Sequence, residues 1–284
     1  MDITEIRTFI EAFGRNSGWN RIPREKALRS DLAGMEMFAS PIAAAAAAED
    51  PAFLRLKREG AVGPQFLLPR EWLPGARSVV SFFLPFTARV REANAESGPE
   101  PAPEWLHGRI EGQEFIDRLS RALVEHLQEK GGDAVSPAVD PRFASCTLKN
   151  TVFLDGNGTP LPVSFTSNWS ERHVAFVCGL GTFGLSKGLI TSRGVAGRFG
   201  SVITTHPLPP DNVIPEELYG NCTMCGECAV KCPVGAISPE TGKDHVLCSE
   251  YLDLMKKKHS PRYGCGKCQT GVPCEKEIPK KHKR

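Results

Sequence analysis

The segment NCTMCGECAVKCPVGAIS, residues 221–238, contains cysteines separated by two, two and three residues, and a proline follows the last of them. These cysteines are Cys222, Cys225, Cys228 and Cys232. The first three can present their sulfurs from one tight loop, whereas the fourth opens the next predicted helix and faces away from them. The segment therefore predicts one metal cluster that takes three of these thiolates and a neighbouring cluster that takes the fourth.

This spacing is that of bacterial ferredoxins, which hold two [4Fe–4S] clusters. Two such clusters need eight thiolates, and four further cysteines follow the segment. By the crossed ligation of two-cluster ferredoxins, we assign Cys222, Cys225, Cys228 and Cys274 to the first cluster. The second then takes Cys232, Cys248, Cys265 and Cys268. The interval before Cys274 is longer than the usual three residues, so this ligand departs most from the pattern.

Zinc sites and disulfides are the two alternatives to iron–sulfur clusters that remain open. Zinc sites normally use paired C-x2-C knuckles rather than so dense a run. Disulfides are disfavoured in a reducing compartment. Only Cys146 and Cys178 lie outside the cysteine-rich segment, and both are expected to be small buried apolar residues.

The composition is that of an ordinary globular protein. Of 284 residues, 40% are hydrophobic and 24% are charged, and the net charge is +2. This charge does not favour nucleic acid or an anionic membrane as partner. No stretch approaches the roughly 20 apolar residues of a membrane-spanning helix. The start, MDITEIRTFIEAFGRNSG, resembles neither a secretory nor a twin-arginine leader, so we expect a cytoplasmic protein.

Hydrophobic periodicity predicts the elements before the cysteines. Residues 3–14 form an amphipathic helix in this prediction. The run SPIAAAAAAED, 40–50, is predicted as a helix because Ser40 can cap it, Pro41 can open it and alanine favours it. Also predicted are a buried strand at 76–86, a flexible loop at 93–105, a helix at 114–132 and a hairpin at 150–165. HPLPPDNVIP, 206–215, reads as a linker.

The segment SERHVAFVCGLGTFGLSKGLITSRGVAGRFGSVITTHPLPPD, 170–211, followed directly by the cysteines, resembles the epoxyqueuosine reductase and reductive dehalogenase families. The shared pattern is a Glu-Arg pair, a Gly-Leu-Gly-x-x-Gly loop, an arginine, and a strand with a threonine. LPGARSVVSFFLPF, 73–86, is similar to the early strand of these families. The resemblance covers about residues 70–275.

The resemblance implies an α+β fold, with a nitroreductase-like α/β core in residues 1–210 and a ferredoxin-like module in 211–284. The core would bind cobalamin in a base-off state, and the nearer cluster would reduce its cobalt. Family members remove an oxygen or a halide from an organic substrate. The implied cofactor-binding residues are Glu171, Arg172, Gly179, Gly181, Thr182, Gly184 and Arg198. Lys187 is a further candidate partner for cofactor amides or phosphate.

The glycine loop can also be understood from its residues alone. Glycines at 179, 181 and 184 allow close backbone approach to a flat ligand, or they can serve a structural turn. HVAFVC, which precedes the loop, can be a strand, as a dinucleotide-binding fold requires. That fold is disfavoured because no acidic residue follows at a suitable distance.

Two features depart from the family pattern. The family aspartate that serves as proton donor aligns without gaps on Phe165. With an insertion it aligns on Asp140 in SPAVDPRF, which we predict as the catalytic proton donor; the alternative is an ordinary Asp-Pro turn. The chain ends at KEIPKKHKR without the helical repeats that hold tRNA in the family, so tRNA is not expected as a partner. His173 and His206 are candidates both for cofactor-facing groups and for structural residues.

Three functions remain open. The protein is a cobalamin-dependent reductase of a small substrate, a carrier that reduces corrinoid for a partner enzyme, or an iron–sulfur reductase that binds FMN instead. Each of them needs an external electron donor of ferredoxin or flavodoxin type.

Overall fold

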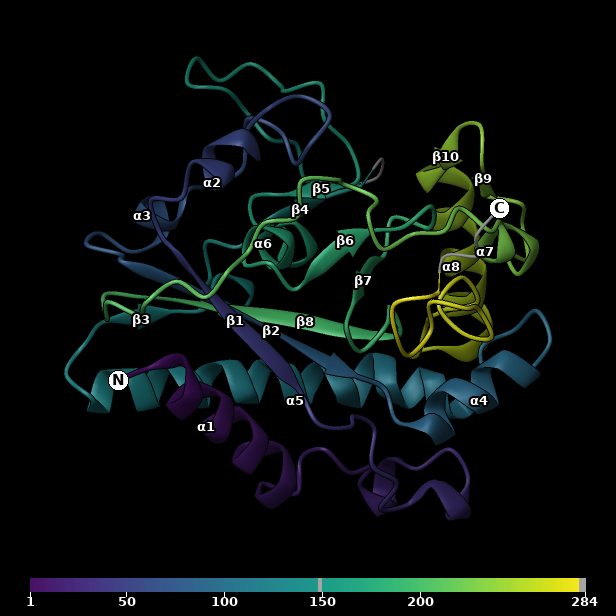
Figure 1. The fold of residues 1–284 in the computed structure, drawn as a ribbon. Helices are drawn as coiled ribbons and strands as arrows, with labels where there is room; N and C mark the ends of the chain where they lie inside the picture. The colour runs from purple at the N-terminus through teal and green to yellow at the C-terminus, as the bar shows by residue number, and fades with distance from the viewer. Residues whose placement is uncertain (148–149, 281–284) are drawn as a thin grey trace.

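The central strand of the fold is β2 (Ser78–Pro85), in which every residue is buried, as the sequence predicts. The computed structural model describes residues 1–147 and 150–280. β2 pairs antiparallel with β1 (Ile42–Ala47) on one side and with β8 (Gly197–Thr204) on the other. β3 (Ala134–Val135) completes the sheet order β1-β2-β8-β3. Figure 1 shows helices on both faces of this sheet.

Alternate residues of β2 face two separate hydrophobic clusters. Val80, Phe82 and Leu84 pack toward α1 (Ile3–Asn16) and α5 (Pro103–Glu129). Val79 and Phe83 pack toward α6 (Glu171–Val177) on the opposite face. Since both faces of β2 are covered, its sequence is continuously apolar rather than alternating. The helix predicted at 3–14 is confirmed as α1, which Asp2 caps at Glu5 N.

The predicted alanine helix is wrong, because residues 42–47 form β1. Alanine favours a helix by only some tenths of a kcal/mol per residue, and packing overrides that preference. Here Ala43 and Ala45 join the cluster on the α5 face, and Ala44 and Ala46 join the cluster on the α6 face. The small side chains let a strand be covered on both sides.

The predicted loop at 93–105 is mostly helical. α4 (Ala88–Glu96) occupies its beginning, and α5 starts at Pro103, well before the predicted residue 114. The buried Asn94 side chain accepts a hydrogen bond from Ala102 N at 3.1 Å and joins the two helices. Proline at the first turn suits a helix start. The predicted hairpin at 150–165 retains its turn, where Asp155 N donates to Thr159 O at 2.8 Å, but it shows one isolated bridge rather than paired strands.

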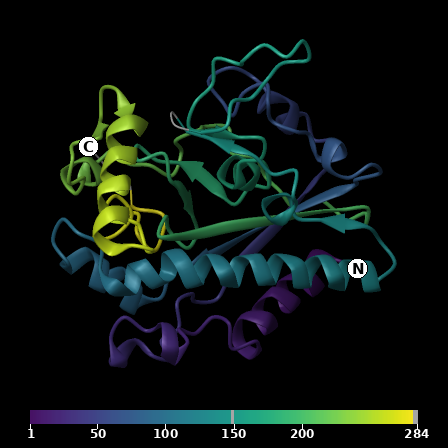
Figure 2. The same ribbon diagram turned by 180° about the vertical axis from the view of Figure 1, so that it is seen from behind.

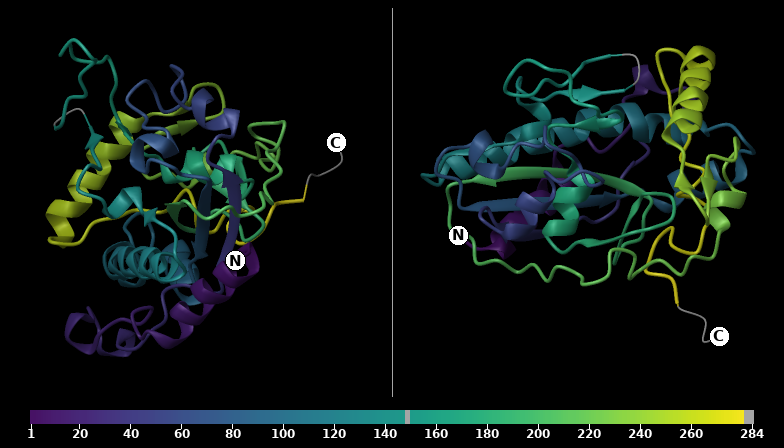
Figure 3. Two further views of the ribbon diagram at one scale, coloured as in Figure 1. Left: turned by 90° about the vertical axis from the view of Figure 1, so that its left-hand side faces the viewer. Right: turned by 90° about the horizontal axis from the view of Figure 1, so that it is seen from above.

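The cysteine-rich segment packs against one end of the core (Figure 2). It contains α7 (Glu227–Val230), β9 (Ile237–Ser238), β10 (Gly242–Lys243) and α8 (His245–His259). Tyr251 on α8 donates to Pro99 O at 2.7 Å. In the view from above, α8 stands beside the end of the sheet (Figure 3). The nitroreductase-like character of the core and the division between residues 210 and 211 stay predictions.

The remaining elements are short. They are α2 (Pro51–Arg55), α3 (Pro69–Trp72), β4 (Ser145–Cys146), β5 (Thr166–Ser167), β6 (Gly181–Phe183), β7 (Leu189–Thr191) and the 3-10 turns η1 (Arg24–Lys26), η2 (Ser30–Leu32) and η3 (Pro137–Val139). Within the described ranges, every helix is too short or too polar to cross a bilayer.

Candidate iron–sulfur site and cavity

The four cysteines predicted for the first cluster lie together. Cys222, Cys225, Cys228 and Cys274 line one small pocket, which the turn between β6 and β7 closes with Gly184, Leu185 and Ser186. The backbone of Cys274 is fixed to the core, because Val195 N donates to its carbonyl at 2.9 Å. The fold therefore brings the most distant ligand in sequence, Cys274, to the other three.

The electrostatic neighbours of Cys274 and of Cys265 fall into the same two sets. Burial raises the pKa of Cys274 to about 12, and so do its neighbours Cys222, Cys228 and Cys225. Burial likewise raises the pKa of Cys265 to about 12, with Cys268, Cys248 and Cys232 as its charged neighbours. Burial and the neighbouring Cys268 raise the pKa of Cys228 to about 11, so the two quartets are adjacent.

Both quartets suit cubane clusters by their donor chemistry. Each offers four free thiols, the ligand set of a [4Fe–4S] cluster. In addition, Ala236 N donates to Cys232 Sγ at 3.2 Å, a contact of the kind that tunes cluster potentials.

Residues of α4 hold the loop of the second quartet. Asn94 donates to Cys265 O at 3.0 Å and to Thr270 Oγ1 at 3.1 Å. The Lys267 side chain is buried and donates to Asn94 O and, at 2.7 Å, to Ser97 Oγ. Because both acceptors are neutral, they do not compensate the positive charge of Lys267, which lies close to the second quartet. The sequence alone does not indicate Asn94 or Lys267 as functional residues, because their roles depend on a contact between α4 and a loop far along the chain.

A cavity of about 1350 Å³ opens beside α6. This volume exceeds the roughly 300–1,000 Å³ of ordinary ligand pockets and leaves room for a large cofactor with a small substrate. Aromatic and charged side chains share the wall. They include Arg109, Phe143, Phe165, Arg172, His173, Phe176, Phe183, Lys187, Tyr219 and His245.

Arg172 and His173, at the start of α6, reach the cavity. An Arg172 N–H group donates to Lys187 O at 2.8 Å, and the rest of the side chain is accessible through the cavity. Partial removal of the guanidinium from water lowers the pKa of Arg172, whereas the nearby Cys268 and Cys248 raise it. Burial, together with the positive charges of Arg172 and Lys187, lowers the pKa of His173 to about 4. His173 is therefore neutral near pH 7.

Lys187 and Tyr219 meet in the cavity wall. Lys187 Nζ donates to the Tyr219 hydroxyl at 3.2 Å. The sequence pattern indicates Lys187 as a candidate but not Tyr219. The one local signal for Tyr219 is its position three residues before Cys222, which does not indicate a cavity.

Glu171 does not line the cavity. Its carboxyl oxygens are buried and have no hydrogen-bond partner among the described residues. Burial raises the pKa of Glu171 to about 7, and weaker interactions with Ser201 and Trp169 oppose this rise. Its role toward a cofactor stays a prediction.

The glycine loop packs closely against the protein's own backbone. HVAFVC, which could have been a strand, lies in α6, and Gly179, with φ +76°, ends that helix. A Cβ at Gly179 would lie 2.9 Å from Val213 backbone atoms, and one at Gly181 would lie 2.2 Å from Ile190 O. The buried Thr182 hydroxyl accepts from Asn221 N at 2.7 Å. These contacts are to the protein's own chain, and cofactor binding by these residues stays a prediction.

Gly181→Ala tests this structural role. The Cβ would force β6 and β7 apart, so we expect a loss of about 1–3 kcal/mol in stability. The measurement is the thermal midpoint of cofactor-free protein. Gly156→Ala is the control, because no atom lies within 4 Å of the Cβ that it adds. An unchanged midpoint for Gly181→Ala would return this glycine to the candidates for ligand contact.

Arg198 and His206 lie away from the cavity. Arg198 donates to Gln113 on α5, and its Nε has no partner within the described ranges. Burial lowers the pKa of Arg198 to about 9. The His206 ring lies 2.9 Å from Leu127 O through Nε2, which fits the structural role of the two considered for it.

Asp140 does not reach the cavity either. Arg142 donates from Nε and from an Nη group to the two carboxylate oxygens, both at 2.8 Å. These bonds lower the pKa of Asp140. A carboxylate that is paired in this way and absent from the cavity wall is a poor proton donor. The geometry argues against the predicted catalytic role, and the turn adjoining Pro141 accounts for the residue.

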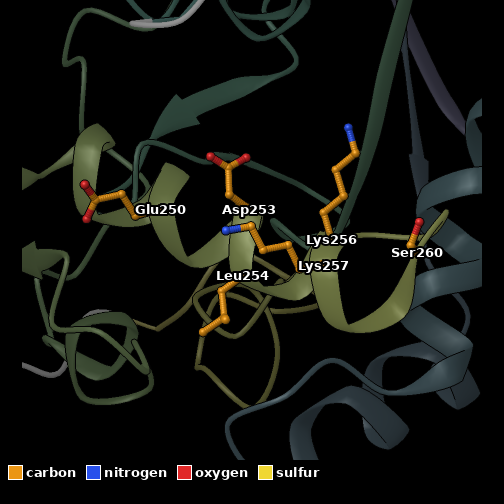
Figure 4. A pocket seen from close by; sticks show the side chains of 6 residues that line it. All are labelled: Glu250, Asp253, Leu254, Lys256, Lys257 and Ser260. Carbon is orange, nitrogen blue, oxygen red and sulfur yellow. The ribbon is translucent and has the colours of Figure 1, made fainter.

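A second depression, of about 640 Å³, lies on the outside of α8 (Figure 4). All its lining residues belong to α8 or follow it directly, so no second element encloses a ligand. Two carboxylates and two ammonium groups line it. They are Glu250, Asp253, Lys256 and Lys257, with Leu254 and Ser260. We assign no site there.

The fold and the paired cysteine quartets define a class: an iron–sulfur protein of mixed α and β structure. A family model described as a 4Fe-4S binding domain matches residues 218–238, which contain Cys222, Cys225, Cys228 and Cys232. The comparison with curated proteins found no significant sequence match.

Comparison with solved structures shows which known folds the chain resembles. It is similar to a catabolic reductive dehalogenase, with a TM-score of 0.52 and 15% identity over 84% of this chain and 30% of that one. The same similarity holds for that enzyme in complex with 3-bromo-4-hydroxybenzoic acid. It is also similar to an epoxyqueuosine reductase from Bacillus subtilis, with a TM-score of 0.49 and 18% identity over 98% of this chain and 67% of that one. The predicted resemblance to the reductive dehalogenases is thus confirmed as a likeness of fold.

Proposed function

We propose that this protein is an iron–sulfur reductase, in which two [4Fe–4S] clusters deliver single electrons to a corrinoid in the cavity, and that it reduces a small organic substrate there. The observation that carries the proposal is the adjacency of the second quartet to the cavity. Arg172, in the cavity wall, lies within the electrostatic influence of Cys268 and Cys248. A structure of the same fold is described as suggesting a mechanism for B12-dependent dehalogenation.

The arrangement gives the electron path a direction. Cys225 in the first quartet is exposed, and Met224 beside it is 48% exposed, so an external donor can approach there. Cys268 of the second quartet is an electrostatic neighbour both of Cys228 in the first quartet and of Arg172 in the cavity wall. Electrons would enter at the first cluster and leave from the second.

The cavity residues fit a bound corrinoid. When bound, the corrinoid would supply low-valent cobalt as the reductant. Arg172 and His173 would hold polar groups of the ligand, and Phe143, Phe176 and Phe183 would exclude water.

Replacing a leaving group by hydrogen also needs a proton, which Tyr219 can donate from its hydroxyl. The Lys187 ammonium, 3.2 Å away, stabilises the tyrosinate that remains.

Anaerobic reconstitution followed by ultraviolet–visible spectroscopy tests the assignment. We expect cluster absorption and, after addition of cobalamin, retained corrinoid bands. Retention of FMN instead would favour the flavin alternative. Retention of cobalamin that the protein reduces, without turnover of any organic probe, would favour the carrier. Retention of neither cofactor contradicts the proposal.

Tyr219→Phe is expected to lower turnover by about 10²–10⁴-fold, because general acid catalysis is lost. Corrinoid affinity should stay the same, since the ring remains. The probe is 3-bromo-4-hydroxybenzoic acid under reducing conditions, with bromide release as the readout. Asp140→Asn is the matched comparison and should keep its turnover. The reverse outcome would restore Asp140 as the donor and remove Tyr219.

A further inference from the structure

The cavity wall carries a group of cations without carboxylate partners. Among the described lining residues the basic side chains are Arg55, Lys57, Arg109, Arg172 and Lys187, and Glu59 is the one acid. Lys57 is neutralised, because its Nζ lies 2.9 Å from Glu71. The wall is therefore strongly positive.

Arg109, Arg172 and Lys187 donate to neutral oxygens. Arg109 donates to the Tyr263 hydroxyl at 3.1 Å, and Lys187 to the Tyr219 hydroxyl. Arg172 donates to a backbone carbonyl. Over residues 1–147 and 150–280, none of the three has an acidic side chain within ion-pair distance. A cleft lined by cations that have no acidic partner attracts an anion into it.

The three cations act on the same region. Arg109 lies near enough to Arg172 to lower its pKa. Burial lowers the pKa of His173 most, and Arg172 and Lys187 lower it further. Burial and Lys243 lower the pKa of His245 most, and the same two cations add to that effect. The second quartet supplies counter-charge to Arg172 through Cys268 and Cys248. Arg109 and Lys187 line the same cavity as Arg172, and the Arg109 guanidinium also lies 4.7 Å from the centroid of the Tyr263 ring.

We propose that Arg109, Arg172 and Lys187 form a binding site for a carboxylate or phosphate group inside the cavity. The inference rests on the proposed function, because the anion belongs either to the nucleotide tail of the corrinoid or to the substrate. Arg172 suits this role: a planar guanidinium recognises both oxyanions with paired hydrogen bonds. Its bond to Lys187 O uses one nitrogen, and the others have no partner in the described part of the chain.

Binding titrations of the cluster-loaded full chain test the site. The probes are cobalamin against cobinamide, which lacks the nucleotide phosphate, and benzoate against benzamide. Arg172→Gln is compared with Arg55→Gln, which removes a positive charge elsewhere on the cavity wall. We expect Arg172→Gln to weaken one anionic probe about tenfold or more relative to its neutral analogue. Arg55→Gln should weaken both members of each pair alike.

The pattern identifies the source of the anion. Selective loss of cobalamin affinity assigns the site to the cofactor phosphate, and selective loss of benzoate affinity assigns it to the substrate. Equal effects on every probe, with only a shift in a cluster potential, overturn the inference, because Arg172 would then serve the cluster alone. If the unaltered protein binds no corrinoid, the proposed function fails, whereas the benzoate arm still decides the anion site.

Discussion

Cys232→Ala is expected to remove about half of the roughly eight iron atoms that two cubanes hold. The lost cluster is the second one, although Cys232 lies in the same short segment as three ligands of the first. The reason is spatial. Cys232 is a charged neighbour of Cys265 and Cys268, whereas Cys222, Cys225 and Cys228 surround Cys274.

Double substitutions test this assignment of the cysteines to two clusters. Cys232→Ala combined with Cys265→Ala should lose no more iron than either change alone, because both remove the same cluster. Cys232→Ala combined with Cys225→Ala should lose nearly all of it. The iron losses are expected to be non-additive for two ligands of one cluster and additive for ligands of different clusters. Iron and sulfide analysis on anaerobically purified protein gives the readout, and circular dichroism confirms folding. Full iron loss from Cys232→Ala with Cys265→Ala contradicts the partition.

Some of this site could be predicted from the sequence. The cysteine spacing is a local signal with one common solution, so the two quartets followed from residues 222–274 alone. β2 and α1 were also predictable, because burial and periodicity act within a few residues. The alanine run was not, since its conformation depends on β2, more than thirty residues away in sequence.

The cavity was beyond sequence reasoning for the same reason. Tyr219 and Lys187 come from different segments, and Arg109 comes from α5. The glycine loop is a local pattern whose partner the sequence does not identify. Its spacing suits a ligand, yet Gly179 and Gly181 make room for Val213 and Ile190. A motif shows that the backbone approaches something closely, and the fold decides what it approaches.

Glu111→Ala is expected to destabilise the protein by about 3–5 kcal/mol, because it leaves the buried Arg262 guanidinium without its counter-charge. Glu111 on α5 accepts from two Nη groups of Arg262, both at 2.6 Å, and its Oε2 lies 2.8 Å from His107 Nδ1. All three side chains are buried. His107 Nε2 accepts from Leu28 N at 3.1 Å, so its proton resides on Nδ1 and the ring is neutral. Arg262 precedes Cys265, so this network fastens the cysteine-rich segment to the core.

The matched control is Glu114→Ala, also on α5, whose exposed pair with Lys26 contributes no more than about 1 kcal/mol. Thermal midpoints of the cluster-loaded protein measure the difference, which we expect to be on the order of 10 °C. Similar midpoints for the two variants would show that Arg262 finds another partner and does not depend on Glu111.

Acid should reproduce the Glu111 effect in the unaltered protein. Burial opposes ionisation of Glu111, but bonds from His107 and Arg262 outweigh it and lower its pKa from 4.5 to about 2. A carboxyl whose pKa is lower in the folded state stabilises the fold above its unfolded value, and this contribution disappears as pH falls toward the folded value. The Glu111 contribution should therefore be complete above pH 4.5 and vanish toward pH 2. The midpoint difference between unaltered protein and Glu111→Ala should shrink over that interval. A difference that stays constant with pH would mean that the network acts by packing and not by charge.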